Sequence, residues 1–80
     1  MNRKRRDDLR QIVNSIRQII QTTESIRMDE VEYYDNIPDN LLESEYACDS
    51  EFACDQLELA INDLDIAIDE IEDAIEGYQG

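Results

Sequence analysis

Carboxylates are the side chains of this sequence with the greatest chemical capacity, because 21 of its 80 residues are Asp or Glu and none is His. The lack of His excludes any Ser/His/Asp or Cys/His catalytic arrangement, and any imidazole metal site, within a single chain. Paired carboxylates act as general acid and base only in a concave, water-excluding site that perturbs their pKa values. A narrow helical rod offers no such site, so we expect no enzymatic activity.

Two other groups of residues could bind a metal ion, but neither has the required pattern. The acids between Asp63 and Glu70 would need a central Gly to form a calcium loop, and the sequence there continues a helical pattern without Gly. Cys48 and Cys54 provide two ligands where a zinc site takes four. Their spacing places them on different faces of one helix. We therefore predict reduced thiols, no metal site and no cofactor.

Charge is divided unevenly along the chain, whose net charge is −14. All seven Lys and Arg residues lie within residues 1–27, where three acids leave a charge of +4, whereas residues 28–80 carry 18 acids and no cation. This asymmetry leaves a surplus of negative charge that can attract a partner. The candidate partner-binding acids are those nearest the middle of the chain, namely Asp29, Glu30, Glu32, Asp35, Asp39, Glu43, Glu45, Asp49, Glu51 and Asp55.

Apolar residues in the first half of the chain recur at helical spacing. Residues 9–29 divide into three heptads, with apolar residues on one face and Arg and Gln on the opposite face. This pattern predicts a helix over residues 2–34. Its predicted contacts with a second helix, here termed the seam, are Leu9, Ile12, Ile16 and Ile19.

The second half of the chain repeats more strictly. Alanine recurs every seven residues from Ala53 to Ala74, and larger apolar residues beside it alternate steps of four and three, as far as Tyr78. Such steps are typical of a left-handed coiled coil. They predict a helix over residues 41–76, with its start near Leu41 or Ser44, that ends at Gly77. The predicted seam residues of this helix are Leu57, Ile61, Leu64, Ile68, Ile71 and Ile75.

Turn chemistry is confined to residues 35–40, where Pro38 follows Asp35 and Asn36. Because this linker is short, the two helices should be antiparallel neighbours. We predict an all-α fold, an antiparallel two-helix coiled-coil hairpin in one domain over residues 1–80, with a short helical turn over residues 39–43. This pairing would place Arg3 to Arg6 beside the acids at positions 70–76.

Additional apolar residues widen the apolar face of each helix beyond a single seam. They are Ile19, Ile20, Val31, Tyr33, Phe52 and Ile66. A hairpin of two helices buries only one stripe on each, so we expect a homodimer that forms a four-helix bundle.

Three segments carry a resemblance to known sequences: the basic start Asn2–Arg6, the centre Tyr34–Leu41 with Glu43–Glu45, and the Ala-Ile-Asp-x-Ile-type heptads from Ala60 to Ile75. In these segments the chain resembles small acidic helical proteins of unknown function encoded by phages and prophages of Gram-positive bacteria. The resemblance implies an accessory phage gene, acting in the cytoplasm of the bacterial host, and a role in blocking host nucleases or other defence systems.

Two hypotheses for the function follow. On an exposed helix, carboxylates three or four residues apart are about 5 to 6 Å from each other, close to the spacing of successive phosphates. The leading hypothesis is a noncatalytic protein that binds the basic surface of a host defence protein, a CRISPR effector or restriction nuclease, and inhibits it by mimicking nucleic-acid phosphates. The alternative is a homo-oligomeric coiled-coil structural or assembly protein whose acids only keep it soluble.

Direct binding to nucleic acid or membrane is not expected under either hypothesis. A chain of net charge −14 repels phosphates and anionic lipids at long range. The sequence also lacks the roughly 20 consecutive apolar residues that cross a bilayer, and its basic start lacks the apolar segment of a signal peptide.

Overall fold

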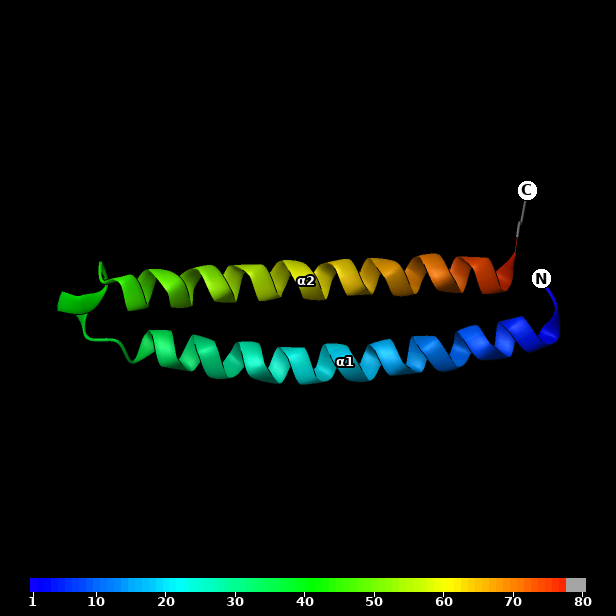
Figure 1. The fold of residues 1–80 in the computed structure, drawn as a ribbon, viewed down its shortest axis with the longest axis horizontal. Helices are drawn as coiled ribbons and strands as arrows, with labels where there is room; N and C mark the ends of the chain where they lie inside the picture. The colour runs from blue at the N-terminus through cyan, green and yellow to red at the C-terminus, as the bar shows by residue number, and fades with distance from the viewer. Residues whose placement is uncertain (78–80) are drawn as a thin grey trace.

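The computed structural model describes residues 1–77, which form an antiparallel hairpin of two long helices (Figure 1). Helix α1 spans Arg3–Asp35 and helix α2 spans Glu45–Glu76, with a short 3₁₀ helix, η1, at Asp39–Leu41 between them. The helices pack along most of their length into a rod of 59 × 23 × 14 Å. The predicted all-α hairpin is therefore confirmed. Helix α2 begins one residue after Ser44, the later of the two predicted starts, because η1 forms a separate turn before it.

Side-chain and glycine caps account for the ends of the helices. Asn2 Oδ1 accepts a hydrogen bond from the Arg5 backbone N–H at 2.8 Å, and Ser44 Oγ accepts one from the Ala47 N–H at 3.3 Å. These contacts satisfy N–H groups that lack a partner in the first turn of a helix. Gly77 ends α2 with φ +85°, a left-handed conformation that glycine adopts without steric cost.

The seam of each helix follows alternating steps of three and four residues. In α1 the buried and half-buried residues in this pattern are Arg6, Leu9, Val13, Ile16, Ile20, Thr23, Arg27, Glu30 and Tyr34. In α2 they are Ala47, Ser50, Cys54, Leu57, Ile61, Leu64, Ile68, Ile71 and Ile75. The most deeply buried large side chains are Val13, Ile61 and Ile68, each of which contributes about 1.5 to 3 kcal/mol through burial. Tyr78, predicted to continue this seam, lies outside the described residues.

The structure corrects the seam predicted for α1. Ile12 and Ile19 are 46 % and 52 % exposed, and the neighbouring Val13 and Ile20 face α2 in their place. Because both residues of each pair are apolar, the periodicity of α1 alone permits either register. The observed register is the one in which Arg27 lies in the seam and contacts an acid on α2. All six seam residues predicted in α2 are buried or half-buried.

The predicted pairing of the basic start with the end of α2 is also wrong. Arg17 Nη2 lies 3.1 Å from Glu72 Oε1, so α2 ends only four residues after the position opposite Arg17. Arg6 precedes Arg17 by eleven residues, so the first turns of α1 extend past the end of α2 (Figure 1). Lys4 there forms an ion pair within its own helix instead, with Asp8 at 2.8 Å.

Candidate functional site

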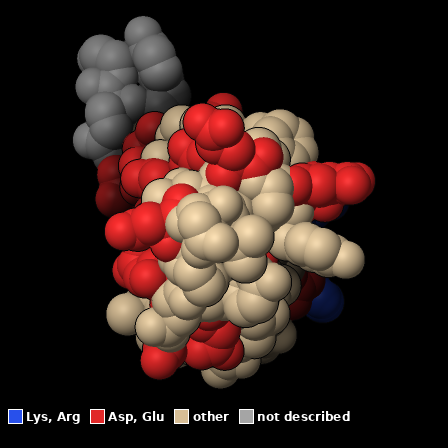
Figure 2. Space-filling view, turned by 90° about the vertical axis from the view of Figure 1, so that its left-hand side faces the viewer, with Lys and Arg blue, Asp and Glu red and all other residues tan. Residues whose placement is uncertain are grey.

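The end of the hairpin that carries η1 is the most strongly acidic part of the molecule. We define the turn-end surface as residues 29–55, which comprise the end of α1, η1 and the start of α2. Nine of the ten acids predicted to bind a partner are exposed there, and the tenth, Glu30, is half-buried because it occupies a seam position. Figure 2 views this end along the rod and shows acidic side chains around an uncharged central area. The structure thus brings the predicted acids together at one end.

The turn-end surface also contains exposed apolar side chains that the sequence pattern did not assign to a site. Leu41, Leu42 and Tyr46, here called the apolar centre, are exposed, and Tyr46 is the most exposed of them at 76 %. A shallow depression of about 260 Å³ beside them is lined by Tyr33, Asn36, Ile37, Pro38, Leu41, Ser44 and Tyr46. The signal in the sequence was an apolar pair directly after a proline turn, where polar residues are usual.

Backbone hydrogen bonds hold the turn-end surface in shape. The Asn36 side chain donates through Nδ2 to the Glu32 carbonyl at 2.9 Å and so closes the end of α1. The Leu41 N–H donates to the Pro38 carbonyl at 2.8 Å, and the Ser44 N–H donates to the Leu41 carbonyl at 3.0 Å. The first bond closes the end of α1, the second forms the turn of η1, and the third joins η1 to the cap of α2, so hydrogen bonds order the backbone that carries the acids and the apolar centre.

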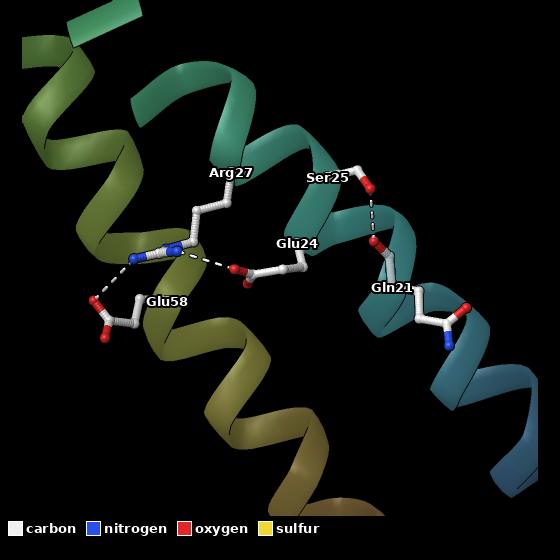
Figure 3. A network of polar contacts seen from close by, with 5 residues as sticks. All are labelled: Gln21, Glu24, Ser25, Arg27 and Glu58. Carbon is white, nitrogen blue, oxygen red and sulfur yellow. Dashed lines mark hydrogen bonds and ion pairs between the residues drawn. The ribbon is translucent and has the colours of Figure 1, made fainter. Parts of the chain in front are cut away.

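Arg27 is the cation nearest in sequence to the turn-end surface. Its guanidinium lies 3.1 Å from Glu24 on the same helix and 3.7 Å from Glu58 on α2, and Figure 3 shows it between the two carboxylates. Arg27 is the last cation in the chain. The turn-end surface therefore contains ten acids and no Lys or Arg, and this surplus of one sign produces a negative potential there.

Ser50 and Cys54 occupy seam positions of α2 within the turn-end surface. Ser50 is almost fully buried, and Cys54 is half-buried near Glu30. Burial raises the pKa of the Cys54 thiol, and the carboxylate of Glu30 raises it further, against the opposing effect of Arg27. Cys54 and the exposed Cys48 are both free thiols. A raised pKa disfavours the thiolate, so Cys54 is poorly suited to nucleophilic chemistry.

The described part of the chain contains no cluster of three or more Cys, Asp and Glu side chains arranged to hold a metal ion. None of its helices combines the length and the apolar character needed to cross a membrane. What the turn-end surface can do chemically is to attract and contact a positively charged partner.

Comparison with protein-family models, with curated proteins and with solved structures finds no match for this chain. The fold and the site define the molecule as an acidic helical hairpin with a charged surface at its turn.

Proposed function

We propose that this chain is a noncatalytic phage accessory protein that binds and inhibits a host defence protein, a CRISPR effector or a restriction nuclease, in the cytoplasm of the bacterial host. In this proposal the turn-end surface occupies the basic groove that normally binds nucleic acid. The carboxylates take the place of phosphates and contact the Lys and Arg side chains of that groove.

The observation that carries the proposal is the gathering of ten acids, without a cation, at one end of the rod. If the acids served only solubility, an even distribution along the rod would suffice. Concentration at one end instead produces a local field that accelerates association with an oppositely charged surface. Glu32 and Asp35 are exposed and lie three residues apart on α1. Carboxylates at this spacing are about 5 to 6 Å from each other, close to the distance between successive phosphates.

The apolar centre supports a protein, rather than a small cation, as the partner. Interfaces between proteins commonly combine a desolvated apolar centre with a charged rim, and Tyr is enriched at the contacts that carry most of the binding energy. Tyr46 and Leu41 are exposed, and their neighbours in the sequence include the exposed acids Asp39, Glu43 and Glu45. The acidic rim would accelerate association and favour a basic partner, and the apolar centre would provide the contact area.

The test is inhibition of DNA binding by purified CRISPR effectors and restriction nucleases of Gram-positive bacteria. We expect the protein to displace DNA from at least one of them, with an affinity that falls as salt rises between about 50 and 200 mM, because both binding events depend on charge. If no nucleic-acid enzyme loses DNA binding, or if the inhibition does not respond to salt, the proposal is wrong.

The second candidate function is a homo-oligomeric structural or assembly protein. The observation that favours it is the number of large apolar side chains left exposed along the helices, including Ile26 on α1 and Phe52 and Leu59 on α2. Contiguous exposed apolar surface commonly marks a site of association. In that case apolar contacts between copies, rather than the acids, would carry the function, and charge-neutralising substitutions at the turn would leave it unchanged.

A further inference from the structure

Four exposed apolar residues form a straight row along α1. Ile12, Ile19, Ile26 and Tyr33 are spaced seven residues apart and are between 46 % and 56 % exposed. Each directly precedes a seam residue of α1, so the row runs along one side of the seam. Residues at a spacing of seven stay aligned on a coiled-coil helix. The row is therefore a second apolar contact face on α1, and α2 does not cover it.

The side of the hairpin on which this row lies follows from an observed ion pair. Arg17 and Glu72 each directly follow a seam residue, and they meet 3.1 Å apart between the helices. In an antiparallel pair, positions that follow the seam meet on one side, and positions that precede it meet on the other. The alanine row of α2, from Ala53 to Ala74, also precedes seam residues, so it flanks the α1 row on the side away from Arg17.

The distribution of charge along α1 favours a second α1 helix, in antiparallel orientation, as the partner that covers the row. Residues 3–17 carry six cations and two acids, a charge of +4, and residues 24–35 carry five acids and one cation, a charge of −4. Residues 18–23 carry no charge. An α1 helix from a second copy, running in the opposite direction, would bring each positive half against a negative half. Helix α2 carries no cation, so contacts made mainly between α2 helices would be repulsive.

The row is also self-complementary in such a pair. When two α1 helices are antiparallel, Ile19 of one can face Ile26 of the other, and Ile12 can face Tyr33, with Thr22 and Thr23 near the centre. A shallow groove of about 400 Å³ beside Ile19 is lined by the small residues Ser15, Thr22 and Thr23 together with Gln18. Small side chains at the centre allow the two backbones to approach closely.

We propose that two copies of the chain associate through this row, with their α1 helices antiparallel and their turn-end surfaces at opposite ends of the dimer. The proposal rests on the row and the charges of α1 and does not depend on the proposed function. The contact takes in Tyr33 at the edge of each turn-end surface and leaves η1 and the start of α2 outside it, so under the proposed function one dimer would bind two partner molecules.

The oligomeric state of two matched variants tests this contact. We expect the wild-type protein to sediment as a dimer, and Ile19→Asp to raise the dissociation constant of the dimer about 100-fold, because each copy loses a buried side chain and gains a buried charge. Leu59→Asp changes a similarly exposed residue on α2 and should leave the dimer intact. A monomeric wild type, or a dimer that dissociates with Leu59→Asp and not with Ile19→Asp, would overturn the proposal. Circular dichroism checks that both variants remain helical.

Disulfide trapping tests the direction of the helices. In a chain with Cys48→Ser and Cys54→Ser, we expect Thr22→Cys to form a disulfide between copies on oxidation, because Thr22 lies near the two-fold axis. Ser15→Cys should not link to its own counterpart, which the antiparallel arrangement places about 20 Å away along the axis. Efficient linkage through position 15, or none through position 22, would contradict the antiparallel contact.

Discussion

Arg27 on α1 and Glu58 on α2 lie 3.7 Å apart across the hairpin, and this contact places the last cation of the chain at the base of the acidic end. The side chain of Arg27 is only 24 % exposed, and its aliphatic stem occupies a seam position. It thus fills space between the helices and forms ion pairs with two carboxylates at once.

Replacement of Arg27 should therefore cost more than replacement of an exposed arginine. We expect Arg27→Ala to lower the free energy of unfolding by about 1 kcal/mol, through lost packing of the stem and the loss of a partly screened ion pair. Arg17→Ala, which also removes an ion pair with α2 but from a more exposed position, should cost less than about 0.5 kcal/mol. Urea denaturation of both variants measures the difference, and equal losses would contradict the role assigned to the stem.

The seam accounts for most of the stability of the hairpin. Ile68→Ala should lower the free energy of unfolding by about 2 to 4 kcal/mol, because Ile68 is buried against α1. Ile66→Ala removes the same atoms from an exposed position two residues away and should change stability by less than about 0.5 kcal/mol. Thermal unfolding followed by circular dichroism tests this pair. Similar losses in the two variants would mean that the helices do not pack through the observed seam.

The serine cap at the start of α2 should stabilise the acidic end. Ser44→Ala removes the acceptor for the Ala47 N–H and should cost about 1 kcal/mol. Ser25→Ala is the matched control, because Ser25 Oγ donates to the Gln21 carbonyl within α1 (Figure 3) and caps no helix end. Since Ala favours helix, the control should be neutral or slightly stabilising. Hydrogen exchange should show faster exchange near residue 47 in Ser44→Ala alone.

The two cysteines should differ in reactivity. Cys48 is exposed, whereas Cys54 is half-buried and has a raised pKa owing to burial and to the nearby carboxylate of Glu30. Alkylation at neutral pH should therefore modify Cys48 first, which mass spectrometry of the digested protein can follow. Faster modification of Cys54 would contradict the burial described here.

The same pKa shift has a consequence for stability. A folded-state pKa above the unfolded value near 9 means that the folded state retains the thiol proton more strongly. The contribution of the protonated Cys54 thiol to the free energy of unfolding is thus fully present below about pH 9, and it is lost as the pH rises through the folded-state pKa. Cys54→Ala should remove that part of the decline at alkaline pH.

The fold was predictable from the sequence where the apolar pattern allows only one set of residues to form the seam. In α2 the alanine row and the alternating Ile and Leu residues permit a single seam, so all its predicted residues face α1 or lie half-buried. In α1 the neighbours Ile12 and Val13 are both apolar, and the choice between them depends on contacts with α2. A seam arginine such as Arg27 was not predictable either, because its contact with Glu58 depends on how the two helices are aligned.

The candidate site was predictable in its charge but not in its shape. Counting charges along the chain identified the acids, and the turn at Pro38 brought them to one end. The apolar centre depends on η1, a 3₁₀ turn too short to bury Leu41 and Leu42. Since neither residue belongs to a periodic pattern, their exposure became evident only in three dimensions.

Under the proposed function, the position of the acids, and not merely their number, allows this protein to compete with nucleic acid. Two variants of equal net charge separate these possibilities. One neutralises four acids of the turn-end surface, through Asp35→Asn, Asp39→Asn, Glu43→Gln and Glu45→Gln. The other neutralises four acids nearer the opposite end of α2, through Asp63→Asn, Asp65→Asn, Asp69→Asn and Glu70→Gln.

The decisive measurement is displacement of labelled DNA from a nuclease that the wild-type protein inhibits, with each variant titrated at the same ionic strength. We predict that the turn-end variant loses at least about tenfold in affinity, which corresponds to about 1.4 kcal/mol, and that the second variant competes almost as well as the wild type. Equal losses in the two variants would show that total charge alone governs binding and would contradict the role of the turn-end surface.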